Sequence, residues 1–205
     1  MTQSLLTAID HIEMYVFNAF QAANFYRSVF GFDIIAYAGP ETGLKDQISY
    51  FLRQGSIRLV ISSSLNRDSS LLKHVINHDE SVKDIAFTTN NVSQLYEATL
   101  KAGAVSILEP TEIDDGKDKI IKATIATFGN TVHSFIERED PSSHELPFYI
   151  PLNYPLKKNP FNLETVDHIA IAVEKEVLGN GDSFMKMCWI FIFFLQKTLR
   201  QMRVE

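Results

Sequence analysis

The stretch that decides the fold is AIDHIEMYV at residues 8–16, because a second copy of its pattern, TVDHIAIAV, stands at residues 165–173. Each copy opens with an acid–histidine pair and continues with apolar residues at alternate positions, as a half-buried strand does. Internal repetition indicates a chain assembled from like modules. We therefore expect each copy to open a module of its own.

The residues after the first copy predict a helix followed by three strands. Apolar positions at helical spacing indicate a helix over residues 19–30, which Gly31 ends. Three strands are expected at 32–38, 48–53 and 57–62, with Gln54-Gly55 as a hairpin signal. The aromatic residues of this unit are expected to lie in the core rather than to line a ligand site: Phe25, Tyr26, Phe30, Phe32 and Phe51.

The same order of elements recurs further along the chain. A helix capped within residues 68–70 has no counterpart in the first unit, and a strand at 82–88 follows it. Asn91 or Ser93 caps the next helix, which runs to Lys101. Three more strands are expected at 106–108, 119–126 and 131–137. The two strand-helix-three-strand units predict an α+β fold in which a cup-shaped mixed sheet carries its helices outside.

The composition of the chain changes after residue 138. Residues 139–164 hold five prolines among polar residues, which is typical of an extended linker between domains: Pro141, Pro147, Pro151, Pro155 and Pro160. We therefore divide the chain into an N-terminal domain at residues 1–138, a linker at 139–164, and the start of a further domain at 165–205.

Composition narrows the class of protein. The 205 residues are 45% hydrophobic, which is enough to fill a core, and their net charge is -6. No basic block is present that could neutralise a phosphate backbone, so we expect no nucleic-acid partner. A single cysteine, Cys188, and an N-terminus without the features of a signal peptide predict a cytosolic protein.

Several motifs in succession resemble one family. They are IDHIE (9–13), FY (25–26), GF (31–32), HDESVKDIAF (78–87), GNTVHSFIER (129–138) and VDH (166–168). Together they resemble the vicinal-oxygen-chelate superfamily, which contains glyoxalases and dioxygenases, and within it the 4-hydroxyphenylpyruvate dioxygenase family. The resemblance covers roughly residues 8–175.

That resemblance implies a non-haem Fe(II) enzyme of tyrosine catabolism. The family uses dioxygen to convert an aromatic 2-oxoacid, 4-hydroxyphenylpyruvate, to homogentisate. A triad of two histidines and one carboxylate leaves iron positions open for the oxoacid and for dioxygen. In the family the first ligand lies in the opening strand of the second domain, and His168 matches that position. The other two ligands would lie beyond residue 205, so we assign no catalytic residue and expect an incomplete iron site.

Other functions stay open at this point. His11 occupies the equivalent place in the first module, and with Asp84 and Glu137 it could form a metal site of the kind that glyoxalase-type lyases use, although this pattern is vestigial in the dioxygenases. A small-molecule-binding or dimerising module without iron chemistry, with a possible homo-oligomer, is a further alternative. A synthase that makes hydroxymandelate from the same substrate is another. The remaining histidines have no ligand spacing and are expected to pack or face solvent: His74, His78, His133 and His144.

The chain departs from the family pattern after Lys175. A one-base frameshift near Gly179 would let the neighbouring frame encode VYEDVLDFHL, which resembles FYRSVFGFDI at residues 25–34. We therefore expect a truncated and inactive version of the enzyme. Residues 184–195 are almost all apolar, and as a helix they would reach about 18 Å, short of the roughly 30 Å needed to span a bilayer. No membrane span is expected.

Overall fold

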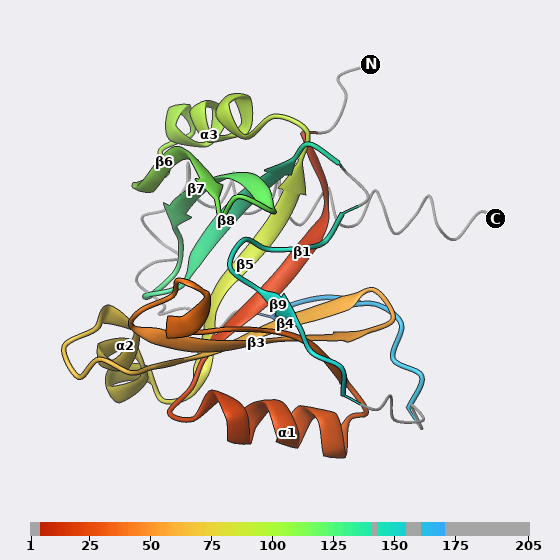
Figure 1. Cartoon of the computed structure of the whole chain (residues 1–205). Coiled ribbons are helices and arrows are strands. Elements are labelled where there is room, and N and C mark those ends of the chain that lie inside the picture. Colours follow the sequence, from red (N-terminus) through yellow and green to blue (C-terminus); the bar gives the residue numbers. More distant parts are fainter. Residues whose placement is uncertain (1–4, 141–142, 155–160, 171–205) are drawn as a thin grey trace.

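The computed structural model describes residues 5–140, 143–154 and 161–170. Its centre is a nine-stranded mixed sheet with the strand order β6-β7-β8-β5-β1-β4-β3-β2-β9 (Figure 1). The two central strands, β1 (Leu6–Tyr15) and β5 (Ser81–Thr89), pair antiparallel. Parallel pairs flank them on both sides, since β4 (Ile57–Ser64) joins β1 and β8 (Val132–Arg138) joins β5.

Each half of the sheet is one strand-helix-three-strand unit, as predicted. The first unit contains β1 and β4 together with the elements α1 (Ala19–Val29), β2 (Asp33–Ala38), the 3-10 turn η1 (Pro40–Thr42) and β3 (Gln47–Gln54). The helix α2 (Ser70–His78) connects the units. The second unit contains β5 and β8 together with α3 (Val92–Lys101), β6 (Ser106–Asp114) and β7 (Lys119–Ala126).

Helices α2 and α3 begin where side-chain caps were expected. Ser69 accepts a hydrogen bond from the backbone N–H of Leu72 at 3.0 Å and begins α2. Asn91, one of the two candidates, accepts from Gln94 at 2.8 Å and begins α3. Each side chain satisfies a backbone donor that the first helical turn leaves without a partner.

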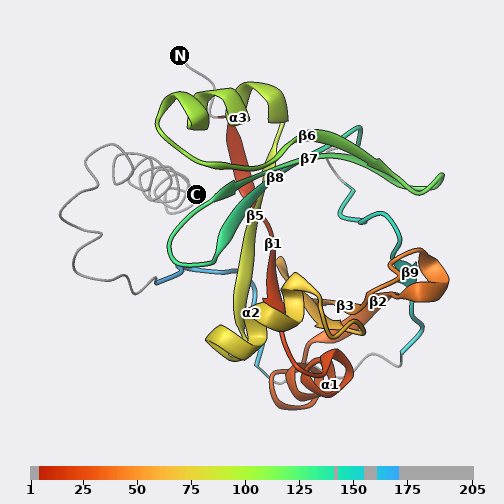
Figure 2. The same ribbon diagram turned by 90° about the vertical axis from the view of Figure 1, so that its left-hand side faces the viewer.

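The sheet curves, and helices α1 and α3 lie outside the curve (Figure 2). Two apolar clusters fill the space between the sheet and its helices: one lies under α3 and includes Leu95 and Phe135, and the other lies under α1 and includes Ala23 and Leu52. A third cluster occupies the opposite face, which we call the inner face: Phe51, Val60, Ala86, Ile120, Ile136 and Leu146. The predicted α+β cup is confirmed.

Two strand predictions need correction. β6 runs to Asp114 rather than ending at Leu108, and it continues through Pro110. Proline lacks a backbone donor but is tolerated there because β6 is an edge strand. A ninth strand, β9 (Ile150–Pro151), extends the opposite edge by pairing with β2.

The aromatic residues of the first unit do not all lie in the core. Phe32 and Phe51 are buried, but Phe25 is 52% exposed and Phe30 is 38% exposed. Helix α1 packs on the sheet through small side chains, with Ala19 and Ala23 buried, and Phe25 projects from another side of the helix because successive residues turn by about 100°.

Residues 143–154, which we call the strap, pass over the inner face. Leu146 is buried in the inner-face cluster, and Tyr149 packs edge-on against Phe51 with ring centroids 6.1 Å apart. The backbone N–H of Leu152 donates to the carbonyl of Ile35. This part of the proline-rich segment is therefore bound to the sheet.

Residues 161–170 contain neither a helix nor a strand. The carbonyl of Glu164 accepts from the backbone and the hydroxyl of Ser56, and the side chain of Ile169 packs on the cluster under α3. The strand expected at 165–173 is thus absent over its described part. The rest of that repeat and the apolar stretch at 184–195 lie outside the described residues. Among the residues that the structure describes, no helix is long and apolar enough to cross a membrane.

Candidate functional site on the inner face of the sheet

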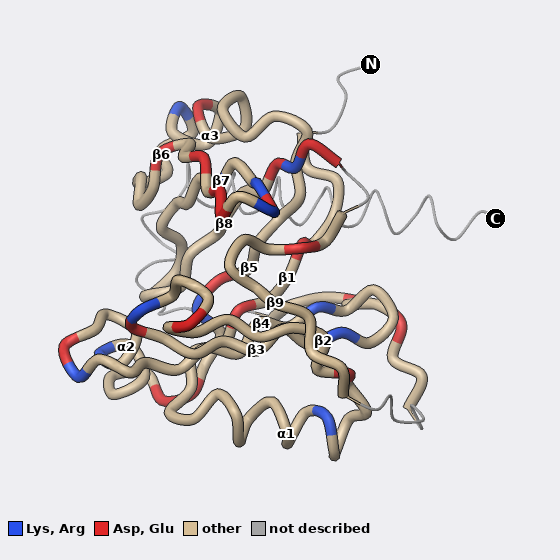
Figure 3. Tube along the Cα trace, in the orientation of Figure 1, with Lys and Arg blue, Asp and Glu red and all other residues tan. Residues whose placement is uncertain are grey.

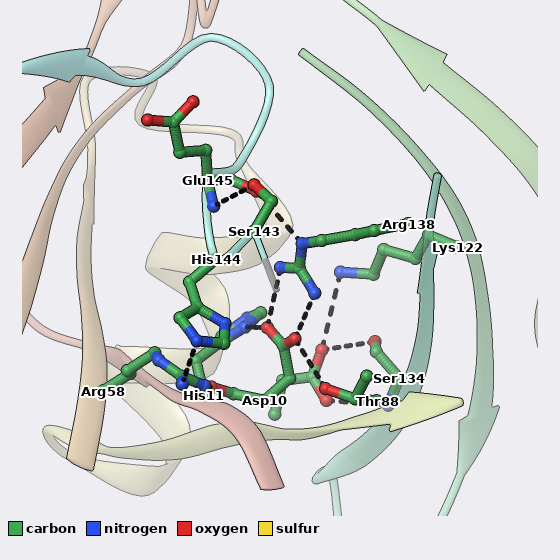
Figure 4. Close-up of polar contacts among 11 residues, drawn as sticks. Asp10, His11, Arg58, Thr88, Lys122, Ser134, Arg138, Ser143, His144 and Glu145 are labelled. Carbon is green, nitrogen blue, oxygen red and sulfur yellow. Dashed lines mark hydrogen bonds and ion pairs between the residues drawn. The ribbon is translucent and has the colours of Figure 1, made fainter. Parts of the chain in front are cut away.

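The Asp10 side chain, near the inner face, contacts three other side chains (Figure 4). Its place in β1 is irregular, because Ile9 pairs with Phe87 and His11 with Ala86, which leaves Asp10 as a one-residue bulge. The Asp10 carboxylate accepts two hydrogen bonds from the Arg138 guanidinium, through Nη1 and Nη2, and one from the Thr88 hydroxyl at 2.9 Å. One carboxylate therefore connects β1, β5 and β8.

His11 shares this carboxylate. Its Nδ1 lies 2.7 Å from Oδ1 of Asp10, and the His11 side chain is 5% exposed. Because an ionised carboxylate only accepts, Nδ1 carries a proton and donates to Asp10. The neighbouring acid thereby fixes the orientation of the histidine ring.

Electrostatics keep Asp10 ionised. Burial raises the pKa of this carboxyl, but the hydrogen bonds and charges of His11 and Arg138 outweigh burial and hold the pKa well below its usual range. The side chains of Asp10 and Arg138 are 2% and 4% exposed, so this is a buried ion pair with two parallel hydrogen bonds. It joins the first unit to the end of the second.

Two similar sets of hydrogen-bonded side chains, which we call the polar relays, lie further along the inner face, one in each unit. Each consists of a carboxylate and two hydroxyl groups. In the first, the Ser62 hydroxyl donates to Glu13 at 2.7 Å, and Ser49 lies 2.7 Å from Ser62. In the second, both the hydroxyl and the backbone N–H of Ser134 donate to Asp84, and Thr124 lies 2.9 Å from Ser134. Glu13 and Asp84 face each other in the β1–β5 register. The relays therefore meet at the junction of the two units.

The charge of one lysine acts on both carboxylates. Lys122 Nζ is 3.6 Å from Asp84 Oδ2 and also attracts Glu13. Burial nevertheless raises the pKa of Glu13, and the charge of Asp84 adds to the increase, while Lys122 and Ser62 oppose it. A carboxyl whose pKa is raised in this way can hold or release a proton closer to neutral pH than an exposed glutamate can.

Glu137 lies elsewhere. Its Oε2 accepts a hydrogen bond of 2.7 Å from the backbone N–H of Val92, at the first turn of α3, where a carboxylate also complements the helix dipole. Asp84 is aligned with Val132 in the β5–β8 pair, so Glu137 lies five residues further along, about 17 Å at the rise of a strand. It shares the side of the sheet with Phe135, which packs under α3.

The structure therefore places His11 and Asp84 on the inner face and Glu137 outside it. Asp84 is already bonded to Ser134 and Lys122. In residues 5–140, 143–154 and 161–170, no three histidine, cysteine, aspartate or glutamate side chains are grouped so that they could hold a metal ion. The described residues do not form an iron site.

His168 is also described. Its Nδ1 lies 2.7 Å from Oδ2 of Asp167, which is the same local arrangement as in the first repeat, but the two side chains are 78% and 81% exposed. Of the other histidines, His74 stacks near His78, and His144 contacts Arg58.

The sequence points to Asp10 only as part of the repeated acid–histidine pair, and it predicts no site role for the other residues that complete this face: Glu13, Arg58, Lys122, Ser62, Ser134 and Arg138. One signal was available for Glu13, because it stands two residues after His11 and so shares its side of a strand. For Arg138, which is 128 residues from its partner Asp10, no local pattern gives the contact.

Comparison with known proteins agrees with this architecture. Residues 8–121, more than half of the chain, match the Glyoxalase/Bleomycin resistance protein/Dioxygenase superfamily. The chain belongs to this superfamily. Among solved structures, this superfamily member is similar to a mutant of 4-hydroxymandelate synthase from Streptomyces coelicolor, with a TM-score of 0.66 and 28% identity over 73% of this chain and 43% of that one. Methylmalonyl-CoA epimerase from Mycobacterium tuberculosis shares the fold, with a TM-score of 0.56 and 15% identity over 68% of this chain and 93% of that one.

Curated relatives narrow the resemblance. A 4-hydroxyphenylpyruvate dioxygenase from Yarrowia lipolytica is 38% identical over 69% of this chain and 37% of its own length. The protein of the same name from Danio rerio is 33% identical over 95% of this chain and 51% of its own length. The chain thus spans about half or less of the length of these relatives.

Proposed function

We propose that this chain is the N-terminal part of an Fe(II)- and dioxygen-dependent oxygenase that converts 4-hydroxyphenylpyruvate to homogentisate, and that its first domain, residues 1–138, does not bind the iron. The observation that carries the proposal is the identity of 33–38% to proteins named 4-hydroxyphenylpyruvate dioxygenase, which extends over as much as 95% of the chain. The aromatic 2-oxoacid and dioxygen would be its substrates. Iron would supply oxygen activation in such an enzyme.

The inner face supports a structural role for residues 1–138. Asp10, Asp84 and Glu137 are each bonded within the domain, to Arg138, to Ser134 and to Val92, so they are not free to coordinate a metal together. We propose that residues 139–164 connect this domain to the iron-binding one, which begins near residue 165. His168 would be the first iron ligand there, since Asp167 orients its ring and leaves Nε2 available.

A chimera tests this proposal. Residues 8–138 of this chain would replace the matching residues of the Yarrowia lipolytica relative, and oxygen uptake with 4-hydroxyphenylpyruvate would be measured together with iron content. We expect a folded chimera that holds iron and releases homogentisate. A chimera that folds and binds iron but consumes no oxygen would contradict the proposal.

Two variants of the chimera locate the iron. His11→Asn should leave its iron content unchanged, whereas substitution of the relative's histidine that aligns with His168 should abolish it. Loss of iron from His11→Asn alone would instead favour a metal site in the first domain.

The similarity to 4-hydroxymandelate synthase makes 4-hydroxymandelate a second candidate product. The solved 4-hydroxymandelate synthase shares 28% identity with this chain, which is close to the range of the dioxygenases. Homogentisate and 4-hydroxymandelate separate by reversed-phase chromatography. We expect homogentisate, and hydroxymandelate as the main product of an enzyme that contains the native partner domain would assign the chain to the synthase.

A further inference from the structure

Two arginines face each other on the β3–β4 hairpin. Arg53 and Arg58 are direct partners in the antiparallel register, and Figure 3 shows the two positive positions of this hairpin close together. Side chains of direct partners begin about 5 Å apart, so like charges in such a pair repel each other. A negative charge near the two arginines would reduce this repulsion.

Both arginines project toward the inner face. Phe51 and Val60, two residues away in each strand, belong to the inner-face cluster, and alternate residues of a strand share one side. Arg58 donates through Nη1 to the backbone carbonyl of Asp10 at 2.9 Å, and its Nη2 lies 2.9 Å from Nε2 of His144 in the strap. Arg58 is therefore fixed in place.

Positive charge is in excess here. Burial lowers the pKa of Arg58; Asp10 opposes this decrease, and the nearby Arg138 and Arg53 charges add to it. The charges that act on Arg58 are thus two guanidinium groups and one carboxylate, and both oxygens of that carboxylate are bonded by Arg138.

Arg53 keeps its donors available. It is exposed, and within the described part of the chain it makes no hydrogen bond and no ion pair; Asp33, its partner in the β2–β3 register, forms none with it within 4.0 Å. His144 is exposed as well. Burial and the charges of Arg58 and Arg138 lower its pKa, so near neutral pH its imidazole is uncharged and Nε2 accepts from Arg58.

We propose that Arg53 and Arg58, with His144 beside them, bind a small oxyanion, either a carboxylate or a phosphate. The planar donors of a guanidinium match two oxygens of either group, and an anion between the arginines would relieve their repulsion. The two arginines lie in the first domain and His144 lies in the strap, and His168 is not part of the site, so the proposal does not depend on the oxygenase activity. The sequence predicts the hairpin but does not single out the arginine pair, which is evident only from the strand register.

The test uses the full chain at constant ionic strength. Inorganic phosphate and benzoate are titrated separately while the arginine Nε–H signals are followed by NMR. We expect saturable shifts of the Arg53 and Arg58 signals with a Kd of about 1 mM, which is the affinity of a few charge-assisted hydrogen bonds at a surface. Arg53→Gln should weaken binding about tenfold. Arg67→Gln removes the same charge from an exposed residue far from the hairpin turn and should leave the Kd unchanged.

The two anions distinguish the ligand classes. Binding of benzoate alone assigns the site to carboxylates, and binding of phosphate alone assigns it to phosphates. Absence of saturable shifts with both anions would overturn the proposal, and so would equal weakening by Arg53→Gln and Arg67→Gln, since that result indicates attraction by net charge alone. Arg53 is exposed, so its substitution should leave the fold intact.

Discussion

The two Asp-His pairs of this chain have the same local geometry and opposite surroundings. In both, Nδ1 of the histidine lies 2.7 Å from an aspartate oxygen. The side chains of Asp10 and His11 are 2% and 5% exposed, whereas those of Asp167 and His168 are 81% and 78% exposed. Repetition of a motif therefore repeats the local hydrogen bond, but the role of the pair is set by what packs around it.

The difference lies in long-range partners. Asp10 also binds Arg138 and Thr88, which come from the opposite unit of the sheet. Among the residues that the structure describes, Asp167 pairs with its neighbour His168 and forms no other ion pair. We conclude that the first pair stabilises the junction of the two units.

The largest effect is expected from Asp10→Ala. This change leaves the Arg138 guanidinium buried without its carboxylate, which costs about 3–5 kcal/mol in similar buried pairs. Asp167→Ala should change the free energy of unfolding by less than about 0.5 kcal/mol, because the residue is exposed. Urea unfolding of the two variants measures both values. Similar losses in the two would contradict a special role for the buried pair.

The free energy of unfolding at acid pH should also depend on the buried pair and not on the exposed one. The pKa of Asp10 is held below the value of about 3.8 expected for the unfolded chain, so its contribution to stability is complete above about pH 4 and is lost as the pH falls further. One such proton changes stability by at most about 1.4 kcal/mol per pH unit. Asp10→Asn should flatten this dependence, and Asp167→Asn should retain it. Unfolding in urea at a series of pH values measures the slopes.

Gly55→Ala tests whether the contact between the β3–β4 turn and Glu164 fixes residues 161–170, which contain the second pair. A Cβ at Gly55 would lie 2.7 Å from the carbonyl oxygen of Glu164, and its φ of +56° disfavours a side chain. Gly116→Ala is a matched control, because φ is +86° there and nothing lies within 4 Å. Both should lose about 1–2 kcal/mol from backbone strain. Only Gly55→Ala should also shift the amide signals of residues 161–170, and unchanged signals would show that this segment does not depend on the hairpin.

Glu137→Ala should have a smaller effect. It removes the acceptor for the Val92 N–H at the start of α3, and loss of such a cap costs about 1 kcal/mol. Glu97→Ala loses only an exposed pair with Lys101 at 3.8 Å, worth about 0.3–0.5 kcal/mol. Thermal unfolding compares the two variants. An equal effect would mean that Glu137 does not anchor the helix.

The sequence predicted what local rules decide. Strands with alternating apolar residues, the caps Ser69 and Asn91, and the Gln54-Gly55 hairpin all depend on neighbours within a few residues. Strand register is a different matter, because the pairing of Glu13 with Asp84 depends on bulges in β1 that the sequence does not reveal. For the same reason, His11, Asp84 and Glu137 could be placed on their strands but not on a common face.

The most direct test follows the His11 imidazole by long-range proton–nitrogen NMR while Zn²⁺ is added to the chain. If Asp10 and His11 form a structural pair, His11 should show the Nδ1–H tautomer, and one equivalent of Zn²⁺ should leave its signals unchanged. A saturable shift of His11 Nε2 that disappears in His11→Asn, with the fold intact, would show instead that the first repeat binds metal.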